Sequence, residues 1–211
     1  MAAMQATKNV LTLKGSVEIV SEFFDFSINS ILYQRGIYAP ETFERRSNYG
    51  LAMMVTKDPQ LEQYLKSVLK QMETWLATGE LQQVVVVVNG IESGETLERW
   101  VFQVETAVDK ENSAQPAQEQ NSKSTKEIKA EISALLRQIT ATVTFLPLLD
   151  EACAFDILMY TDKNSEVPAT WADTDARIIE NGSEVRLRSF DTKIHKVDTA
   201  VSYREAQDDE V

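Results

Sequence analysis

Five consecutive valines, at positions 84–88, limit the possible folds of this chain more than any other feature. Branched side chains favour β-strands, and an apolar run without alternation indicates a strand that is buried on both faces. After a turn at 93–94 the chain continues with alternating Trp100, Phe102 and Val104, which is the pattern of a half-buried strand. We therefore expect a β-hairpin whose first strand is covered on both sides.

Two segments before this hairpin show the apolar periodicity of α-helices. Residues 15–36 place phenylalanine, isoleucine and leucine side chains on one helical stripe. Residues 58–79 open with Asp58 as a helix cap followed by proline, continue as an apolar stripe, and close with Gly79. We expect one helix over each segment.

A third helix is expected between Ser124, which forms a capping-box pattern with Glu127, and the break at Pro147. Arg137 lies on the face opposite its apolar stripe, where a solvated helix would carry a Lys/Glu mixture. Its neighbours there are small: Ala130, Ser133, Ala134 and Ala141. A partner protein at this face and burial of both faces within the domain explain the pattern equally well.

The remaining segments predict further strands. The stretch "CAFDILMYTD" and the stretch "VRLRSF" read as strands, with an irregular, proline-broken region between them. Near the end, Phe190 and Ile194 belong to one alternating run, and Val197 and Val201 belong to a second run in a different phase, with the slip at His195-Lys196. Together, three helices and a mixed β-sheet predict an α+β domain.

Composition narrows the function classes. The formal net charge of −12 makes direct binding to nucleic acid or to an anionic membrane improbable. The single cysteine excludes an internal disulfide and a multi-thiolate zinc site, and no window approaches the roughly 20 apolar residues of a membrane span. We expect a soluble intracellular protein that meets other proteins or small molecules.

The sequence offers little that resembles an active site. His195 is the only histidine, and its place at the phase slip favours a surface or bulge position over a catalytic one. Cys153 reads as a small buried residue, because nothing near it in sequence would lower its pKa. No phosphate-binding glycine pattern and no paired metal-ligand spacing occur, so no cofactor is expected. Trp171, in a polar stretch next to a proline, suggests an exposed or mobile site.

Several longer stretches resemble a known family: "GSVEIVSEFFDFSINSILYQRGIY", "LERWVFQVET", "LLRQITATVTFLPLL", "FDILMYTDK" and "VRLRSFDTKIHKVDTAVSY". They are similar to the mitotic arrest-deficient HORMA-domain family of the spindle assembly checkpoint. The resemblance covers nearly the whole chain. It is weakest in the first ten residues, in the polar connector, in residues 164–184 and at the acidic end.

The resemblance implies an adaptor without catalytic activity that switches between an open and a closed conformer. The closed form wraps a C-terminal safety belt around a partner peptide, the closure motif, which adds as a strand to the sheet edge. We expect a single HORMA domain over 1–211. Its parts would be a core at about 10–161, a connector at about 107–123 near a hinge at 100–110, a belt at about 162–204 and an acidic tail at 205–211.

The same resemblance implies the partners and the location. The peptides come from the anaphase-promoting complex activator and from a kinetochore-bound coiled-coil Mad protein, and capture delays anaphase. A comet-type HORMA adaptor and an AAA+ remodelling ATPase are further expected partners, as is self-association of an open with a closed molecule. The expected locations are the nucleus, the cytoplasm and unattached kinetochores.

Individual residues match the family's functional positions. The resemblance favours an interface on the third helix, and its dimer-interface positions match Arg137, Gln138, Ala134 and Ala141. Positions that report the conformational switch match Leu13, Trp75 and Trp100. The belt contains Trp171, Phe190, Ile194, His195, Val197, Val201 and Tyr203. The two phases of the final stretch would let one segment serve two sheet registers.

Two alternatives remain. The HORMA adaptor subunit of a translesion DNA polymerase captures peptides in a similar way, but its pattern lacks the wording "RQITATVTFLPLL" and "RLRSFDTKIHKV" that this chain keeps. A small enzyme that uses Cys153 with His195 requires those two side chains to meet in space.

Overall fold

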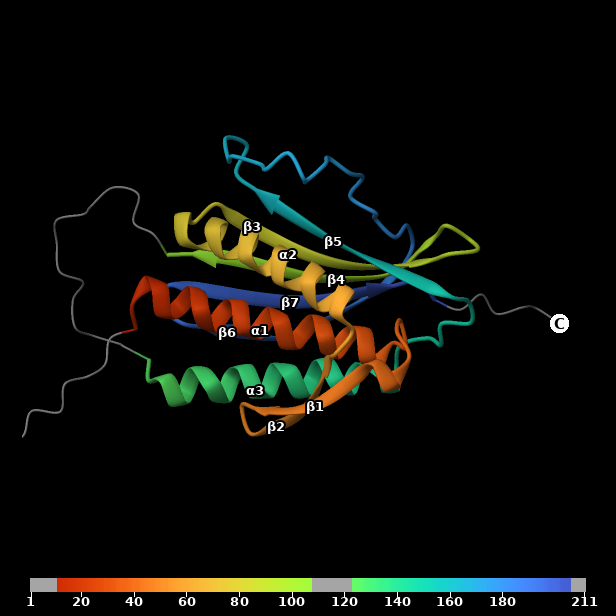
Figure 1. Ribbon diagram of the computed structural model, residues 1–211, viewed down its shortest axis with the longest axis horizontal. Helices are drawn as coiled ribbons and strands as arrows, with labels where there is room; N and C mark the ends of the chain where they lie inside the picture. The colour runs from red at the N-terminus through yellow and green to blue at the C-terminus, as the bar shows by residue number, and fades with distance from the viewer. Residues whose placement is uncertain (1–10, 108–122, 206–211) are drawn as a thin grey trace, which may run out of the picture.

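The computed structural model of the chain describes residues 11–107 and 123–205. Most of the expected connector (107–123) and of the expected acidic tail (205–211) lies outside the described residues. A five-stranded sheet forms one layer, and three helices lie in front of it as a second layer (Figure 1). The α+β class is therefore confirmed.

The helices form where caps and apolar periodicity predict them. Their bounds are α1 Leu13–Gln34, α2 Pro59–Thr78 and α3 Thr125–Ala141, with short 3-10 turns at Pro40–Thr42 and Thr142–Thr144. Asp58 caps α2 by accepting two backbone N–H groups, and Gly79 ends it with a left-handed φ of 71°. Ser124 and Glu127 form the expected capping box of α3. Helix α1 begins two residues earlier than expected, because the hydroxyl of Thr12 accepts the N–H of Gly15.

The main sheet has the strand order β5-β3-β4-β7-β6. The bounds are β3 Leu81–Gly90, β4 Thr96–Thr106, β5 Cys153–Thr161, β6 Ser183–Asp191 and β7 His195–Tyr203. Every pairing among these strands is antiparallel, whereas we expected a mixed sheet. The correction has a simple reason, since side-chain alternation reports which face a residue takes and not the direction in which its strand runs.

The valine run lies at the centre of this architecture, as expected. All five valines are fully buried in β3. Val84 and Val86 join the main core with Trp100 and Phe102, while the alternate valines pack with Leu158 on the other face of the sheet. The hairpin with a doubly buried first strand is thus confirmed.

A second, two-stranded sheet was not expected from the sequence. Strands β1 Phe43–Asn48 and β2 Leu51–Thr56 form a hairpin that packs against α1. Both turn residues have positive φ, at 51° for Tyr49 and 69° for Gly50, as a two-residue hairpin turn requires. Strand β1 is charged and mostly exposed, so its sequence lacks the alternating apolar residues that would have predicted a strand.

The last two strands explain the change of phase near the end of the chain. Strands β6 and β7 form a hairpin, and residues 192–194 are its turn. The change of phase therefore accompanies the passage from one strand to the next, with the turn directly before the expected slip at His195-Lys196. Strand β7 pairs with β4 over nine residues, from Thr106 opposite His195 to Glu98 opposite Tyr203. The expectation that this segment serves two sheet registers stays a prediction.

Candidate functional site

The outer edge of β5 is the first candidate surface. Strand β5 pairs with β3 on one side, and the described part of the chain places no strand on its other side. The segment 162–182 leaves β5 and runs back beside it without regular structure (Figure 1). An open edge of this kind presents unpaired backbone N–H and C=O groups that an added strand can bind.

A cavity of about 470 Å³ lies between this segment, β5 and α2. Its walls include Tyr64 and Val68 from α2, Asp156 and Leu158 from β5, and Thr170, Trp171 and Arg177 from the crossing segment. The carboxylate of Asp156 and the guanidinium of Arg177 are the charged groups in the cavity wall, and the other lining side chains are uncharged. Burial raises the pKa of the Tyr64 hydroxyl, and Asp156 nearby adds to the rise.

Trp171 anchors the crossing segment. It is half-buried, and its ring meets that of Trp75 edge to face at 5.5 Å between centroids. The indole N–H of Trp75 donates to the carbonyl of Glu166 at 3.3 Å. The expected exposed position of Trp171 is therefore wrong, because the neighbouring indole of α2 provides an apolar surface that the local sequence does not reveal.

The second candidate surface combines α3 with β6. Arg137 and Ala141 are exposed, whereas Ala134 is half-buried and Ser133 is buried. Gln138 is half-buried, and its side-chain oxygen accepts the backbone N–H of Arg188 at 2.7 Å. The helix face opposite the core is thus divided, with one side against β6 and the other in solvent.

Features around α3 extend this surface. A groove of about 540 Å³ between α3 and β6 is lined by Ala130, Glu131, Ala134, Leu187, Arg188 and Ser189. Beyond the end of the helix, Phe145 is 46% exposed and Leu148 is 91% exposed. Sequence reasoning did not single out these two apolar residues, although the run "TFLPLL" after the helix end was the available signal.

A buried ion pair fixes the loop that carries these residues. The guanidinium of Arg35 lies 2.5 Å from a carboxylate oxygen of Glu98 and also donates to the carbonyl of Pro147 at 2.5 Å. The indole N–H of Trp100 donates to the other oxygen of Glu98 at 3.0 Å. Burial raises the pKa of Glu98 against the opposing effect of Arg35. Sequence reasoning missed this cluster.

His195 is not at the surface, so the expected surface or bulge position is wrong. The side chain is fully buried, with Nδ1 2.7 Å from the hydroxyl of Ser16 and Nε2 3.1 Å from the carbonyl of Leu76. The hairpin turn carries the ring inward between α1 and α2, which the phase slip alone does not show.

The Cys153–His195 enzyme alternative finds no support. Cys153 begins β5 opposite Gly90, whereas His195 begins β7 opposite Thr106. Because β3 and β4 pair as a hairpin, these positions lie at opposite ends of the sheet. Cys153 is half-buried, and burial raises the pKa of its thiol, which disfavours a reactive thiolate.

The expected switch, hinge and belt residues lie in different parts of the fold. Leu13 is the first residue of α1 and is 40% exposed, while Trp75 and Trp100 are buried in the core. The expected hinge at 100–110 overlaps β4 as far as Thr106. In the C-terminal hairpin the core side chains are Phe190, Val197 and Val201, and the half-buried ones are Ile194 and Tyr203.

Within the described ranges, no helix is both long and apolar enough to cross a membrane. The same residues contain no group of three or more histidine, cysteine, aspartate or glutamate side chains arranged to hold a metal ion.

The fold and its C-terminal hairpin correspond to a known domain. The HORMA domain model matches residues 16–195. Solved structures agree: the chain aligns with one in the crystal structure of the mitotic checkpoint complex with a TM-score of 0.81 and 44% identity, covering 90% of this chain and 99% of that one. Caenorhabditis elegans HTP-2 bound to the HIM-3 closure motif shares the fold at a TM-score of 0.73 and 14% identity, covering 98% and 100%. The chain belongs to the HORMA-domain family.

Full-length relatives place it more narrowly within that family. The chain is 51% identical to the mitotic spindle assembly checkpoint protein MAD2A of Dictyostelium discoideum over 99% of this chain and 100% of the relative. It is 50% identical to MAD2A of Homo sapiens over 97% and 98%, and 46% identical to the mitotic spindle checkpoint protein MAD2 of Zea mays over 100% and 99%. The resemblance to the mitotic arrest-deficient branch is thereby confirmed.

Proposed function

We propose that this protein works in the spindle assembly checkpoint as an adaptor that captures extended partner peptides. The observation that carries the proposal is the open edge of β5, with a cavity beside it and the segment 162–182 running over it. The relatives named as spindle checkpoint proteins support the pathway, and the HTP-2 complex supports closure-motif binding as a use of this fold.

The captured peptide would add to β5 as a sixth strand of the sheet. Backbone hydrogen bonds to the β5 edge would supply sequence-independent affinity, and side chains that enter the cavity would supply specificity. Asp156 and Arg177 in the cavity wall would favour a peptide with side chains of both charges at those points. The belt would then cross over the bound strand, held by Trp171 against Trp75.

The position of the C-terminal hairpin indicates the conformer. Strand β7 occupies the edge of β4 and leaves the edge of β5 free. A hairpin at β5 instead would compete with the peptide. We therefore assign the arrangement to the closed, peptide-receiving form, with Leu13, Trp75 and Trp100 as positions whose packing would differ in the open form.

Two peptide donors fit the proposal, the anaphase-promoting complex activator and the kinetochore-bound coiled-coil Mad protein. Self-association and binding of a comet-type HORMA adaptor would use the α3 surface, where Arg137 and Ala141 are exposed and Phe145 is exposed beyond the helix end. An exposed arginine among small side chains is suited to be an interface hot spot.

The AAA+ ATPase would return the closed form to the open form. With these partners, the protein would act at unattached kinetochores, in the nucleus and in the cytoplasm.

A variant of α2 tests the peptide site. Ser67 is exposed and lines the cavity, so Ser67→Arg should fill the space without disturbing the core. We expect binding of a synthetic closure-motif peptide from an anaphase-promoting complex activator to weaken at least about tenfold, or about 1.4 kcal/mol, by calorimetry.

Gln63→Arg is the matched control, because Gln63 is exposed on the same helix and is not among the residues that line the cavity. It should bind the peptide like the unchanged protein. Equal binding by all three proteins would rule out this cavity as the peptide site.

A further inference from the structure

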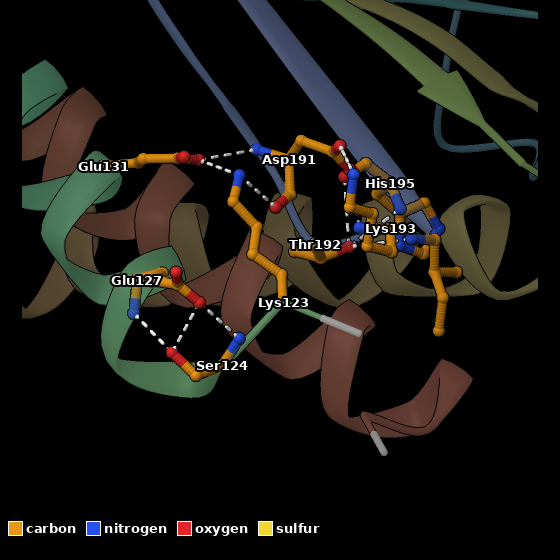
Figure 2. Close-up of polar contacts among 9 residues, drawn as sticks. Lys123, Ser124, Glu127, Glu131, Asp191, Thr192, Lys193 and His195 are labelled. Atoms are coloured by element: carbon orange, nitrogen blue, oxygen red, sulfur yellow. Dashed lines mark hydrogen bonds and ion pairs between the residues drawn. The ribbon is translucent and has the colours of Figure 1, made fainter. Parts of the chain in front are cut away.

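The turn of the β6–β7 hairpin, with its flanking residues Asp191 and His195, makes polar contacts with all three helices or with residues next to them. Figure 2 shows this region, with the start of α3 on one side of the turn. Ser16 from α1 and the carbonyl of Leu76 near the end of α2 contact His195. Three helices distant in sequence thus meet one short segment of the C-terminal hairpin.

The contacts of His195 fix which ring nitrogen carries the proton in the neutral state. The carbonyl of Leu76 only accepts hydrogen bonds, so the Nε2 atom 3.1 Å away carries a proton. In the neutral ring Nδ1 then accepts from the hydroxyl of Ser16 at 2.7 Å. The hydroxyl of Thr192 lies 2.7 Å from that of Ser16 and accepts the backbone N–H of His195 at 2.8 Å. Every polar atom of the neutral ring has a partner, although the site is closed to water.

A second set of contacts holds the other end of the turn. Lys123, directly before α3, pairs with Glu131 at 2.5 Å and donates to the backbone carbonyl of Asp191 at 3.1 Å. The same oxygen of Glu131 accepts the backbone N–H of Asp191 at 3.2 Å. Both backbone groups of the last residue of β6 are therefore bound to one ion pair at the start of α3.

We infer that the segment 191–195 is a latch that holds the C-terminal hairpin on β4, with a neutral half at His195 and a charged half at Lys123 and Glu131. The hairpin leaves β4 only when both halves open. The inference rests on the proposed function in one respect, namely that the hairpin has a second position to move to.

The neutral half makes the latch sensitive to protons. Burial lowers the pKa of His195 from its ordinary value of 6.5. Among the described residues, the hydrogen-bond partners of the ring are the Ser16 hydroxyl and the Leu76 carbonyl, and no carboxylate is among them. The charged groups of the surrounding elements have other partners. On or next to β4, β6, β7 and α3 the pairs include Lys123 with Glu131, Lys193 with Asp191, and Lys196 with Asp198 and Glu105. On α1 Lys14 pairs with Glu18, and on α2 Glu73 pairs with Lys70 and accepts from Ser21.

The direction of the pH effect follows from this shift. Above about pH 6.5 the imidazole is neutral whether the hairpin is docked or released, so docking has its full strength. As the pH falls below that value the released form takes a proton and the docked form does not. The docking equilibrium should then weaken by about tenfold per pH unit, until the lowered pKa of the docked form is reached.

Nuclear magnetic resonance can follow the ring directly, because the chain has a single histidine. The untagged full chain is titrated from pH 7.5 to 5.5. In molecules whose β7 amides are protected from exchange, we expect the imidazole to remain the neutral Nε2–H tautomer below pH 6.5. An imidazole that titrates with an ordinary midpoint while those amides stay protected would overturn the neutral half of the latch.

Substitutions test the charged half. Lys123→Met should speed hydrogen exchange of the β7 amides at least several-fold, because it frees the backbone of Asp191. Lys126→Met is the control. Lys126 is exposed in the first turn of α3, and the ion pair with Glu131 and the hydrogen bond to Asp191 come from Lys123 instead. His195→Gln keeps a donor toward Leu76. It should remove the pH dependence of β7 amide protection, measured relative to the intrinsic exchange rate at each pH, between pH 7.5 and 5.5.

Exchange rates equal to those of the unchanged protein in Lys123→Met would contradict the latch. The exchange measurement uses no peptide, so it is independent of closure-motif binding. Failure of the latch with normal peptide capture leaves the proposed function intact, whereas absence of peptide capture by the unchanged protein counts against the proposed function alone.

Discussion

Glu98 lies on the buried face of β4, in phase with Trp100 and Phe102. The spacing of two residues in "LERWVF" already placed the carboxylate on the same side as two core aromatics. The pattern contained no information about its partner, because Arg35 is 63 positions away at the end of α1. A buried charge can therefore be inferred from alternation, while the side chain that neutralises it depends on the assembled fold.

Removal of this carboxylate should be costly. Glu98→Ala leaves the Arg35 guanidinium buried without its partner, and we expect a loss of about 3–5 kcal/mol in the free energy of unfolding by urea titration. Glu105→Ala on the same strand should change it by less than about 0.5 kcal/mol, since Glu105 is mostly exposed. Similar losses in both variants would show that the ion pair has no special structural role.

Among the elements, the three helices and the β3–β4 hairpin could be predicted because their signals are local. Asp58, Gly79 and Ser124 determine helix ends through contacts within a few residues. The β1–β2 hairpin could not, because β1 is charged and mostly exposed. The antiparallel direction of the sheet could not either, because alternation does not report strand direction. The same holds for the candidate site. The face of small side chains around Arg137 could be predicted from the sequence, whereas the burial of His195 could not.

The proposed function depends most on the C-terminal hairpin. A chain that ends after Lys196 loses most of β7, including Val197 and Val201, whose burial should each contribute about 1.5–3 kcal/mol. We expect folded helices by circular dichroism but no calorimetric binding of a closure-motif peptide. A chain that ends after Arg204 keeps β7 and should bind normally. Full-strength binding by the shorter chain would refute the role given to the hairpin.

For the whole molecule, two surfaces lie on separate parts of one sheet. The β5 edge is at one side of the strand order, and the β6 strand with α3 is at the other. The central strands between them contain the valine run and Phe102. The aromatic core around Phe102 also includes Phe23 from α1 and Phe190 from β6. This separation would let one molecule hold a peptide at one edge while it meets another HORMA domain at the opposite side.

The most direct measurement of the central claim is amide hydrogen exchange of the full chain with and without a closure-motif peptide. Because alternate β5 residues direct their N–H groups away from β3, the account predicts that about half of the β5 amides become strongly protected when the peptide binds, while α3 and β6 are unchanged. Binding that leaves the exchange of all β5 amides unchanged, or that protects the α3–β6 groove instead, would contradict it.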